Sequence, residues 1–342
     1  MGECQCNCYC RKGKGIEERN MKLTYEQIVS ITQGVEYVEQ KEEGIQFHRF
    51  TPDEERVYGA SIFHPKQYAT AGVRLHFKTD STMLIMKVLT SKGSGCEYFA
   101  HDILVNGKWI GSLENGVEHA YGEFEQKFEL GEGNKDVCIH FPWSVCSIVK
   151  ELHLDDGSFL EAVKKDKKIL MFGDSITQGY MAQNPFNCYA SHLADILGAE
   201  GFNKAIGGEV FCPWLAESQN NLEPDYISVA YGTNHWNSSS SEELASICEG
   251  FFEKLVANYP KAKIFALTPI WRKDRTDITR FKSFEEIEEV IQNVVKKYDN
   301  AICISGRNFI PEDENLFADR YLHPNDKGFR YYTEGVKKAL GF

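Results

Sequence analysis

The sequence contains no apolar run that approaches the ~18 consecutive residues needed to cross a membrane. It also lacks an excess of positive charge, because 38 Lys and Arg stand against 50 Asp and Glu, a formal net charge of -12. An acidic surface repels nucleic-acid phosphates and anionic lipid, so we expect neither nucleic acid nor a membrane as a partner. A small molecule or an oligosaccharide fits this charge better, and the sequence indicates no particular oligomeric state.

A secretory signal is missing as well. Neither Met1 nor Met21 is followed by a basic segment and then an apolar one, so we expect a cytoplasmic location. The residues before Met21, "RKGKGIEERN", have purine-rich codons of the kind found in a ribosome-binding site. We therefore interpret residues 1–20 as a translated leader in front of a start at Met21. Native protein that begins at Met1, as measured by mass spectrometry, would contradict this.

The cysteines do not form a metal-binding pattern. Four of the eleven alternate near the N-terminus: Cys4, Cys6, Cys8 and Cys10. They lack the CxxC spacing of zinc sites and have no histidine nearby. The other seven are scattered singly through apolar contexts, where buried free thiols are expected. We therefore expect no metal and no cofactor.

Short alternating segments such as "VRLHFKTD" and "TMLIMKVLT" dominate residues 35–156. Asn106-Gly107 stands between two of them and is a strong hairpin signal. The earlier segment "MKLTYEQIVSIT" predicts one short helix. We expect residues 21–160 to form a domain in which this helix precedes an antiparallel β-sandwich of jelly-roll type.

The pattern changes after the charged segment "EAVKKDKK". Strands are expected at "ILMFG", "FNKAI", "YISVAYG", "KIFALTP" and "AICIS", and helices at residues 188–197, 242–259 and 284–298 and after Pro324. This alternation predicts that residues 161–342 form an α/β domain, a parallel sheet with helices on both faces. Ligands of such sheets bind beyond the carboxyl ends of the strands.

The residues that follow these strands are chemically suited to acyl transfer. They are Gly173-Asp174-Ser175, Gly207-Gly208, Gly232-Thr233-Asn234 and, before the last helix, His323. A serine can attack a carbonyl, a histidine can take its proton, and backbone and amide N–H groups can stabilise the oxyanion. A serine that only caps a helix is the alternative for an isolated strand-helix turn, and the three further groups argue against it.

The motifs "GDSITQG", "NKAIGG", "YGTN" and "LHP" resemble, in order and spacing, the four sequence blocks of the SGNH (GDSL-type) hydrolase superfamily. The resemblance covers residues 168–342 and implies a flavodoxin-like five-stranded parallel sheet. It implies Ser175 as nucleophile and His323 as general base. The implied oxyanion hole consists of the amides of Ser175 and Gly208 and the side chain of Asn234.

Two departures from the family pattern leave part of the site open. His235 stands where the superfamily often has an aspartate. The acid that orients the histidine usually lies three residues before it, and that position is Arg320, with Asp319 one step further back. Asp319 is the expected third member of a triad, and a Ser-His dyad oriented by a backbone carbonyl is the alternative.

Trp236 follows the third block and Trp271 follows the strand "KIFALTPI". Either indole is a candidate to stack on a sugar ring, with His235 as a further substrate-binding candidate, and packing in the core is the alternative for both indoles.

A β-sandwich that precedes an SGNH domain resembles the arrangement of two-domain carbohydrate O-acetylesterases. The resemblance implies a serine esterase that removes O-acetyl groups from oligosaccharides through an acyl-enzyme. A lysophospholipase or acyl-thioesterase of the same superfamily is the competing enzyme and would need an apolar groove for a long acyl chain. A non-catalytic sugar-binding protein is the alternative from another class.

Overall fold

The computed structural model describes residues 20–116, 118 and 120–342. Apart from Asn20, the leader expected from the sequence and its alternating cysteines lie outside the described residues. Within the described part, none of the helices is both long and apolar enough to span a bilayer.

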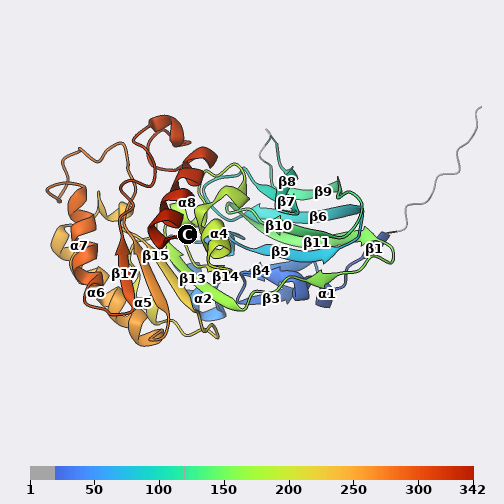
Figure 1. Cartoon of the computed structure of the whole chain (residues 1–342), viewed down its shortest axis with the longest axis horizontal. Helices are drawn as coiled ribbons and strands as arrows, with labels where there is room; N and C mark the ends of the chain where they lie inside the picture. Colours follow the sequence, from blue (N-terminus) through green and yellow to red (C-terminus); the bar gives the residue numbers. More distant parts are fainter. Residues whose placement is uncertain (1–19, 117, 119) are drawn as a thin grey trace, which may run out of the picture.

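Two antiparallel sheets are built from residues 20–162 (Figure 1). The first has the order β3 (Tyr37–Gln40), β4 (Ile45–His48), β11 (Val145–Asp155), β6 (Met83–Lys92), β9 (Gly122–Glu129), with β1 (Asn20–Lys22) paired to β11. The second has the order β12 (Glu161–Ala162), β5 (Arg74–Thr79), β10 (Lys135–His140), β7 (Ala100–Val105), β8 (Lys108–Glu114), with β2 (Thr32–Gln33) paired to β5.

The two sheets enclose one apolar core. On β6, Leu84, Met86 and Val88 are fully buried and alternate with partly exposed residues, as expected of a strand with one face inward. They belong to the same cluster as Leu75 and Phe77 of β5 in the other sheet. The β-sandwich predicted from the alternation is therefore confirmed.

The predicted hairpin at Asn106-Gly107 is confirmed too. The two residues join β7 to β8, and Val105 pairs with Lys108. Their φ angles are 50° and 73°, so both adopt the left-handed conformation that a two-residue type I′ turn requires. Asn and Gly are the residues that tolerate it best.

A five-stranded parallel sheet follows, in the order β14 (Ala199–Asn203), β13 (Lys167–Gly173), β15 (Tyr226–Ala230), β16 (Lys263–Leu267), β17 (Ala301–Ile304). This is the flavodoxin-like order 2-1-3-4-5, so the fold class implied by the sequence blocks is confirmed. The helices among the described residues are α1 (Tyr25–Ile31), α2 (Pro52–Gly59), α3 (Ser175–Gln178), α4 (Tyr189–Ile196), α5 (Pro213–Glu217), α6 (Ser241–Asn258), α7 (Glu285–Val295) and α8 (Asp326–Leu340). Short 3₁₀ turns are η1 (Lys66–Tyr68), η2 (Pro185–Asn187), η3 (Thr233–His235) and η4 (Glu314–Leu316).

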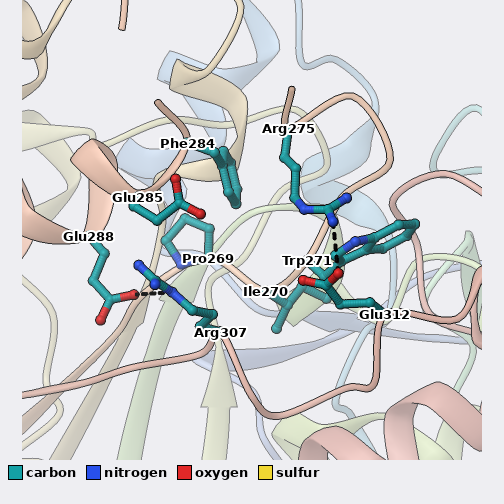
Figure 2. A pocket seen from close by; sticks show the side chains of 9 residues that line it. All are labelled: Pro269, Ile270, Trp271, Arg275, Phe284, Glu285, Glu288, Arg307 and Glu312. Atoms are coloured by element: carbon teal, nitrogen blue, oxygen red, sulfur yellow. Dashed lines mark hydrogen bonds and ion pairs between the residues drawn. The ribbon is translucent and has the colours of Figure 1, made fainter. Parts of the chain in front are cut away.

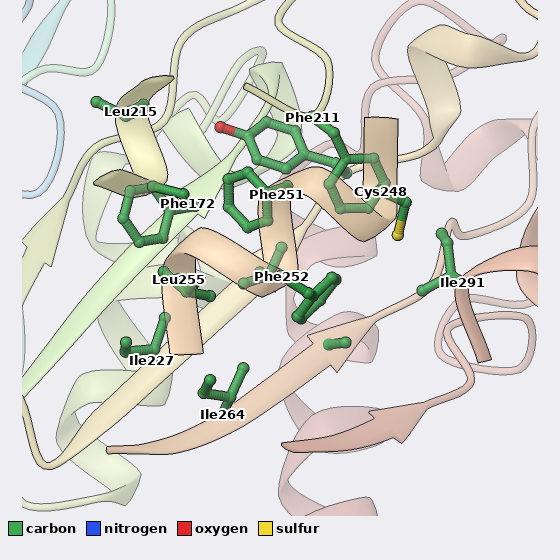
Figure 3. Close-up of a cluster of buried hydrophobic side chains, with 14 of the residues drawn as sticks. Phe172, Phe211, Leu215, Ile227, Cys248, Phe251, Phe252, Leu255, Ile264 and Ile291 are labelled. Carbon is green, nitrogen blue, oxygen red and sulfur yellow. The ribbon is translucent and has the colours of Figure 1, made fainter. Parts of the chain in front are cut away.

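Helices cover both faces of the parallel sheet. Phe172 of β13 faces α5, α6 and α7, where it packs edge-on against Phe251 with ring centroids 5.7 Å apart (Figure 3). Its neighbour Met171 faces the opposite side, in the cluster that includes residues of α4 and α8. Because both faces are buried, β13 reads as a continuous apolar run rather than an alternating one.

Two local expectations were wrong. The strand expected at residues 202–206 is β14, which begins earlier, at Ala199, and ends at Asn203. The Arg49 guanidinium donates to the carbonyl oxygens of Asn203 and Ala205 at this end. The expected β-region also contains helix α2. Its signal was available in the sequence, since Thr51 and Glu54 form a reciprocal capping box around Pro52.

The β-sandwich packs against the β14 edge of the parallel sheet and the neighbouring helix α4 (Figure 1). The Gly34 N–H donates to Glu200 Oε1 of β14 at 2.9 Å. Arg74 of β5 forms an ion pair with Asp195 of α4, with Nη1 2.8 Å from Oδ1. Arg49 Nη1 donates to the Asn203 carbonyl at 2.5 Å. These contacts fix the sandwich beside the strand ends that carry the candidate site.

Candidate active site

Ser175 lies where β13 ends and helix α3 begins. Asp174 caps α3, with Oδ1 accepting from the Ile176 N–H at 3.0 Å, so the serine itself is free of that role. Gly173 has to be glycine, because a Cβ there would lie 2.2 Å from Thr177 Oγ1. Burial raises the pKa of Asp174 to about 6, with the Ile176 amide opposing the shift. Asp174 is a structural residue of this turn.

The structure brings Ser175, His323 and Asp319 into one hydrogen-bonded chain. Ser175 Oγ is 2.9 Å from His323 Nε2, and His323 Nδ1 is 2.7 Å from Asp319 Oδ2. Each member has the neighbour that a nucleophile, a base and an orienting acid require. Their catalytic roles stay predictions.

The loop before His323 explains how Asp319 reaches the imidazole from a position one residue too early for the family pattern. Arg320 has φ 55°, a left-handed conformation that turns the chain back. Asp319 Oδ1 accepts from three backbone N–H groups, of Tyr321 at 2.9 Å, Leu322 at 2.8 Å and His323 at 3.1 Å.

Burial alone would raise the pKa of Asp319, but its hydrogen bonds with His323 and with the backbone outweigh burial and lower it. The carboxylate is therefore ionised at neutral pH. An ionised acceptor at Nδ1 favours the tautomer that carries its proton there and leaves Nε2 free to accept.

Gly207 and Gly208 lie directly beside the serine. A Cβ built on Gly207 would be 3.6 Å from Ser175 Cβ. Gly208 has φ 90°, which strains any other residue, and its N–H has no hydrogen-bond partner among the described residues. A free backbone N–H next to the nucleophile is what an oxyanion donor needs.

Asn234 belongs to the 3₁₀ turn η3 after β15. Its Nδ2 donates to the carbonyl oxygen of Glu209 at 2.8 Å, which leaves the second amide proton available. Buried Arg272 stabilises this turn, because its Nη1 donates to the Thr233 carbonyl at 2.6 Å.

Replacement of Asn234 by alanine should lower kcat by ~10²-fold or more and leave KM almost unchanged, since the oxyanion forms mainly in the transition state. Steady-state kinetics on an aryl acetate measures both constants. Asn237→Ala is a matched control, because Asn237 lies three residues after Asn234 and its side chain donates to Asp274 instead. A change confined to KM would instead make Asn234 a substrate-binding residue.

His235 and Trp236 were expected at the rim, and this expectation was wrong: the structure places both in the interior. Trp236 is 1% exposed, stacks on Phe281 and donates from Nε1 to the Asp274 carbonyl at 3.0 Å. His235 is 2% exposed, and burial lowers its pKa to about 4. Both residues belong to the tight turn η3 or follow it directly, and both side chains pack against protein rather than solvent.

Trp271 is also unable to serve as a sugar platform, which corrects the second aromatic expectation. Arg275 covers one side of the indole at 5.4 Å from the ring centroid, and Phe317 packs with its own centroid 4.9 Å away. Figure 2 shows the small hollow around this tryptophan, where Arg275 pairs with Glu312 and Arg307 with Glu288. Its volume is about 40 Å³, too small for a sugar.

A larger pocket, of about 470 Å³, lies between the loops of the sandwich and the segment after α3. Its lining includes Cys96, Tyr98, Glu114, Trp143, Met181 and Gln183. We call it the Tyr98 pocket. Tyr180 connects the pocket to His323, because its ring lies 4.6 Å from that of Trp143 and 5.0 Å from that of His323, centroid to centroid.

Sequence reasoning did not find the Tyr98 pocket. Tyr180 stands in the first block, "GDSITQGY", and could have been noted, but the sandwich residues carry no motif. Within the described part of the chain, no cluster of three or more His, Cys, Asp or Glu residues is placed to hold a metal ion.

The sequence model of the GDSL-like Lipase/Acylhydrolase family matches residues 171–331. No curated protein matches the chain. Among solved structures, a salicylyl-acyltransferase, SsfX3, from a tetracycline biosynthetic pathway has a TM-score of 0.79 at 20% identity, over 94% of this chain and 96% of that one.

Two carbohydrate esterases of family two are similar as well. The enzyme from Cellvibrio japonicus has a TM-score of 0.65 at 16% identity, over 94% of this chain and 96% of that one. The enzyme from Corynascus thermopiles (Myceliophthora fergusii), which also carries a carbohydrate-binding domain, has a TM-score of 0.61 at 17% identity, over 80% of this chain and 95% of that one. At these identities the similarity establishes the fold alone.

Proposed function

We propose that the protein is a serine esterase that removes O-acetyl groups from carbohydrates, because residues 171–331 match the sequence model of the GDSL-like Lipase/Acylhydrolase family. The observation that carries the proposal is the hydrogen-bonded chain from Ser175 Oγ through His323 to Asp319, with separations of 2.9 and 2.7 Å. Free N–H groups at Gly208 and Asn234 lie on the same rim.

In the proposed reaction, Ser175 Oγ attacks the ester carbonyl carbon while His323 Nε2 takes the hydroxyl proton. The carbonyl oxygen becomes an oxyanion held by the N–H groups of Ser175, Gly208 and Asn234. The carbon–oxygen bond to the sugar then breaks, and the departing alkoxide receives the proton from His323. Water attacks the acetyl-serine with the same base and releases acetate.

The Tyr98 pocket supports a sugar as the alcohol. The leaving oxygen takes its proton from His323, so the alcohol must lie on the histidine side of Ser175, and Tyr180 connects that side to the pocket. A volume of about 470 Å³ is in the range of roughly 300–1,000 Å³ that small-molecule sites have. The partly exposed ring of Tyr98 beside the Glu114 carboxylate suits a ligand with apolar ring faces and many hydroxyls.

Two of the similar solved structures support the carbohydrate class by their names, because both are carbohydrate esterases. A lysophospholipase or acyl-thioesterase would need a long apolar groove beside the acyl group. The Tyr98 pocket is on the alcohol side in this proposal, and the hollow at Trp271 is small, about 40 Å³, and lined by two ion pairs.

Acetyl esters should therefore be preferred over octanoyl esters by at least ~10-fold in kcat/KM, because the proposal assigns the apolar lining of the Tyr98 pocket to the alcohol, where it cannot bury a long acyl chain. Aryl esters from acetate to octanoate measure this preference, and release of acetate from an acetylated xylo-oligosaccharide tests the carbohydrate. Equal kcat/KM for acetate and octanoate would favour the lipase or thioesterase. Sugar binding without hydrolysis would favour the non-catalytic protein.

A further inference from the structure

The peptide unit between Gly207 and Gly208 is the least constrained part of the candidate oxyanion hole. Two adjacent glycines have no Cβ to limit rotation, so the peptide plane between them can flip at little steric expense. A flip would turn the Gly208 N–H away from the reacting carbonyl and point the Gly207 oxygen, a hydrogen-bond acceptor, at it. The hole works only in one of the two orientations.

The nitrogen of Gly207 is held by Gln178 of helix α3, which is itself anchored on the β-sandwich region (residues 20–162). The Gly207 N–H donates to Gln178 Oε1 at 2.6 Å, and Gln178 Nε2 donates to the Trp143 carbonyl at 2.8 Å. Gln178 is buried in α3, only three residues after the serine. This bond holds the Gly207 nitrogen, but it does not restrain the orientation of the peptide between Gly207 and Gly208.

The carbonyl oxygen of Gly207 is held by Lys66, a residue of the N-terminal region. Lys66, the first residue of η1, donates from Nζ to the Gly207 carbonyl oxygen at 2.6 Å. Its ammonium group also lies 3.8 Å from the position that a Cβ of Gly208 would occupy, so it is packed against this peptide. Lysine and glycine are 141 residues apart in the sequence.

We propose that Lys66 is a positioning residue of the oxyanion hole. The Gly207 carbonyl and the Gly208 N–H belong to one planar trans peptide and point in opposite directions. An ammonium group that holds the oxygen therefore sets the direction of the N–H. It also withdraws electron density through the peptide, which makes the N–H a stronger donor. Flipping the peptide would leave the ammonium without its acceptor.

The place of Lys66 is itself well determined. Arg49 Nη2 donates to the Lys66 carbonyl at 3.3 Å, and Arg49 Nη1 donates to the carbonyls of Asn203 and Ala205 at 2.5 and 3.2 Å. One buried guanidinium thus ties the backbone of η1 to the backbone that leads into Gly207. The lysine is held at the right distance by contacts that do not involve substrate.

Glu209, the residue after Gly208, is anchored in the same way. Its carboxyl group binds Tyr58 of α2 at 2.5 Å and Tyr231 at 2.8 Å, while its carbonyl accepts from Asn234. Burial raises the pKa of Glu209 to about 8. Residues of the N-terminal region thereby contact the segment 207–209 on both sides of Gly208: Lys66 binds Gly207 and Tyr58 binds Glu209.

The inference rests on the proposed esterase function, so it is tested in two ways: by kinetics, and by an NMR measurement that does not require the protein to hydrolyse an ester. In Lys66→Met, kcat on an aryl acetate should fall by ~10- to 100-fold with KM within about twofold, less than the loss of a whole oxyanion donor. Lys66→Arg keeps a cationic donor and should recover most of the rate. Lys135→Met is the matched control, because that buried lysine donates to the Ser81 carbonyl at 2.7 Å in the sandwich.

The second arm is the NMR signal of the Gly208 amide in protein labelled with ¹⁵N-glycine. Its proton should move upfield in Lys66→Met, since the peptide loses its polarising cation, and should stay near its original position in Lys66→Arg and Lys135→Met. Should Lys66→Met fail to fold, Lys66→Gln serves in both arms. An unchanged kcat together with an unmoved Gly208 signal would overturn the role of Lys66. Wild-type protein without esterase activity would overturn the proposed function instead, while the NMR arm still decides on Lys66.

Discussion

Ser175→Ala should reduce ester hydrolysis to less than about a thousandth of the wild-type rate, because the acyl-enzyme can no longer form. The fold should survive. The serine is the first residue of α3, but Asp174 supplies the cap, and the hydroxyl has its hydrogen bond with His323. Its loss therefore leaves no buried donor or acceptor without a partner inside the core.

Two measurements check this result. Initial rates on an aryl acetate give the activity, and a fluorophosphonate probe should label the wild type but not the variant. Ser191→Ala, which removes another buried serine hydroxyl from helix α4, should be labelled and active. Retention of more than a few per cent of activity, with contaminating esterase excluded, would contradict the assignment of the nucleophile.

Asp319→Asn should lower kcat by about 10³- to 10⁴-fold at neutral pH. The asparagine oxygen can still accept the three backbone N–H groups that Asp319 Oδ1 holds, so the loop should keep its shape. Its NH₂ group would then face His323 Nδ1 as a donor. The imidazole would have to accept there and carry its proton on Nε2, where it can no longer take the proton of Ser175.

Asp313→Asn is a suitable control, since Asp313 caps the neighbouring turn η4 with the same kind of bond, Oδ1 to the Asn315 N–H at 3.0 Å. It should leave kcat within about twofold, in the range of an exposed substitution away from the site. A kcat of Asp319→Asn within tenfold of wild type would show that a backbone carbonyl orients the histidine. The site would then be a Ser-His dyad.

The residues that sequence reasoning located are those fixed by short-range geometry. Ser175, Gly208 and Asn234 each follow a strand of a parallel sheet, and the carboxyl ends of such strands share one edge by construction. Asp319 was harder, because a simple extended loop would point it away. Its approach to the histidine depends on the left-handed conformation of Arg320, and an arginine in the sequence does not predict that conformation.

The errors concern side chains whose direction depends on packing. Trp236 and Trp271 are next to strand ends, as predicted, yet their rings are covered by Phe281 and by Arg275. Position along a strand predicts which rim a residue is near but not whether its ring faces solvent. Lys66 could not be found at all, since its partner Gly207 is brought to it only by the packing of the sandwich on the sheet.

The packing of the sandwich on β14 also has a consequence for solubility. β14 is an outermost strand of the parallel sheet, and an uncovered edge strand offers unpaired backbone groups to other chains. Gly34 and Arg49 occupy this side of the sheet, with bonds to Glu200 and to the Asn203 carbonyl. Residues 161–342 separated from the sandwich would expose the β14 edge, and we expect such a fragment to aggregate through it.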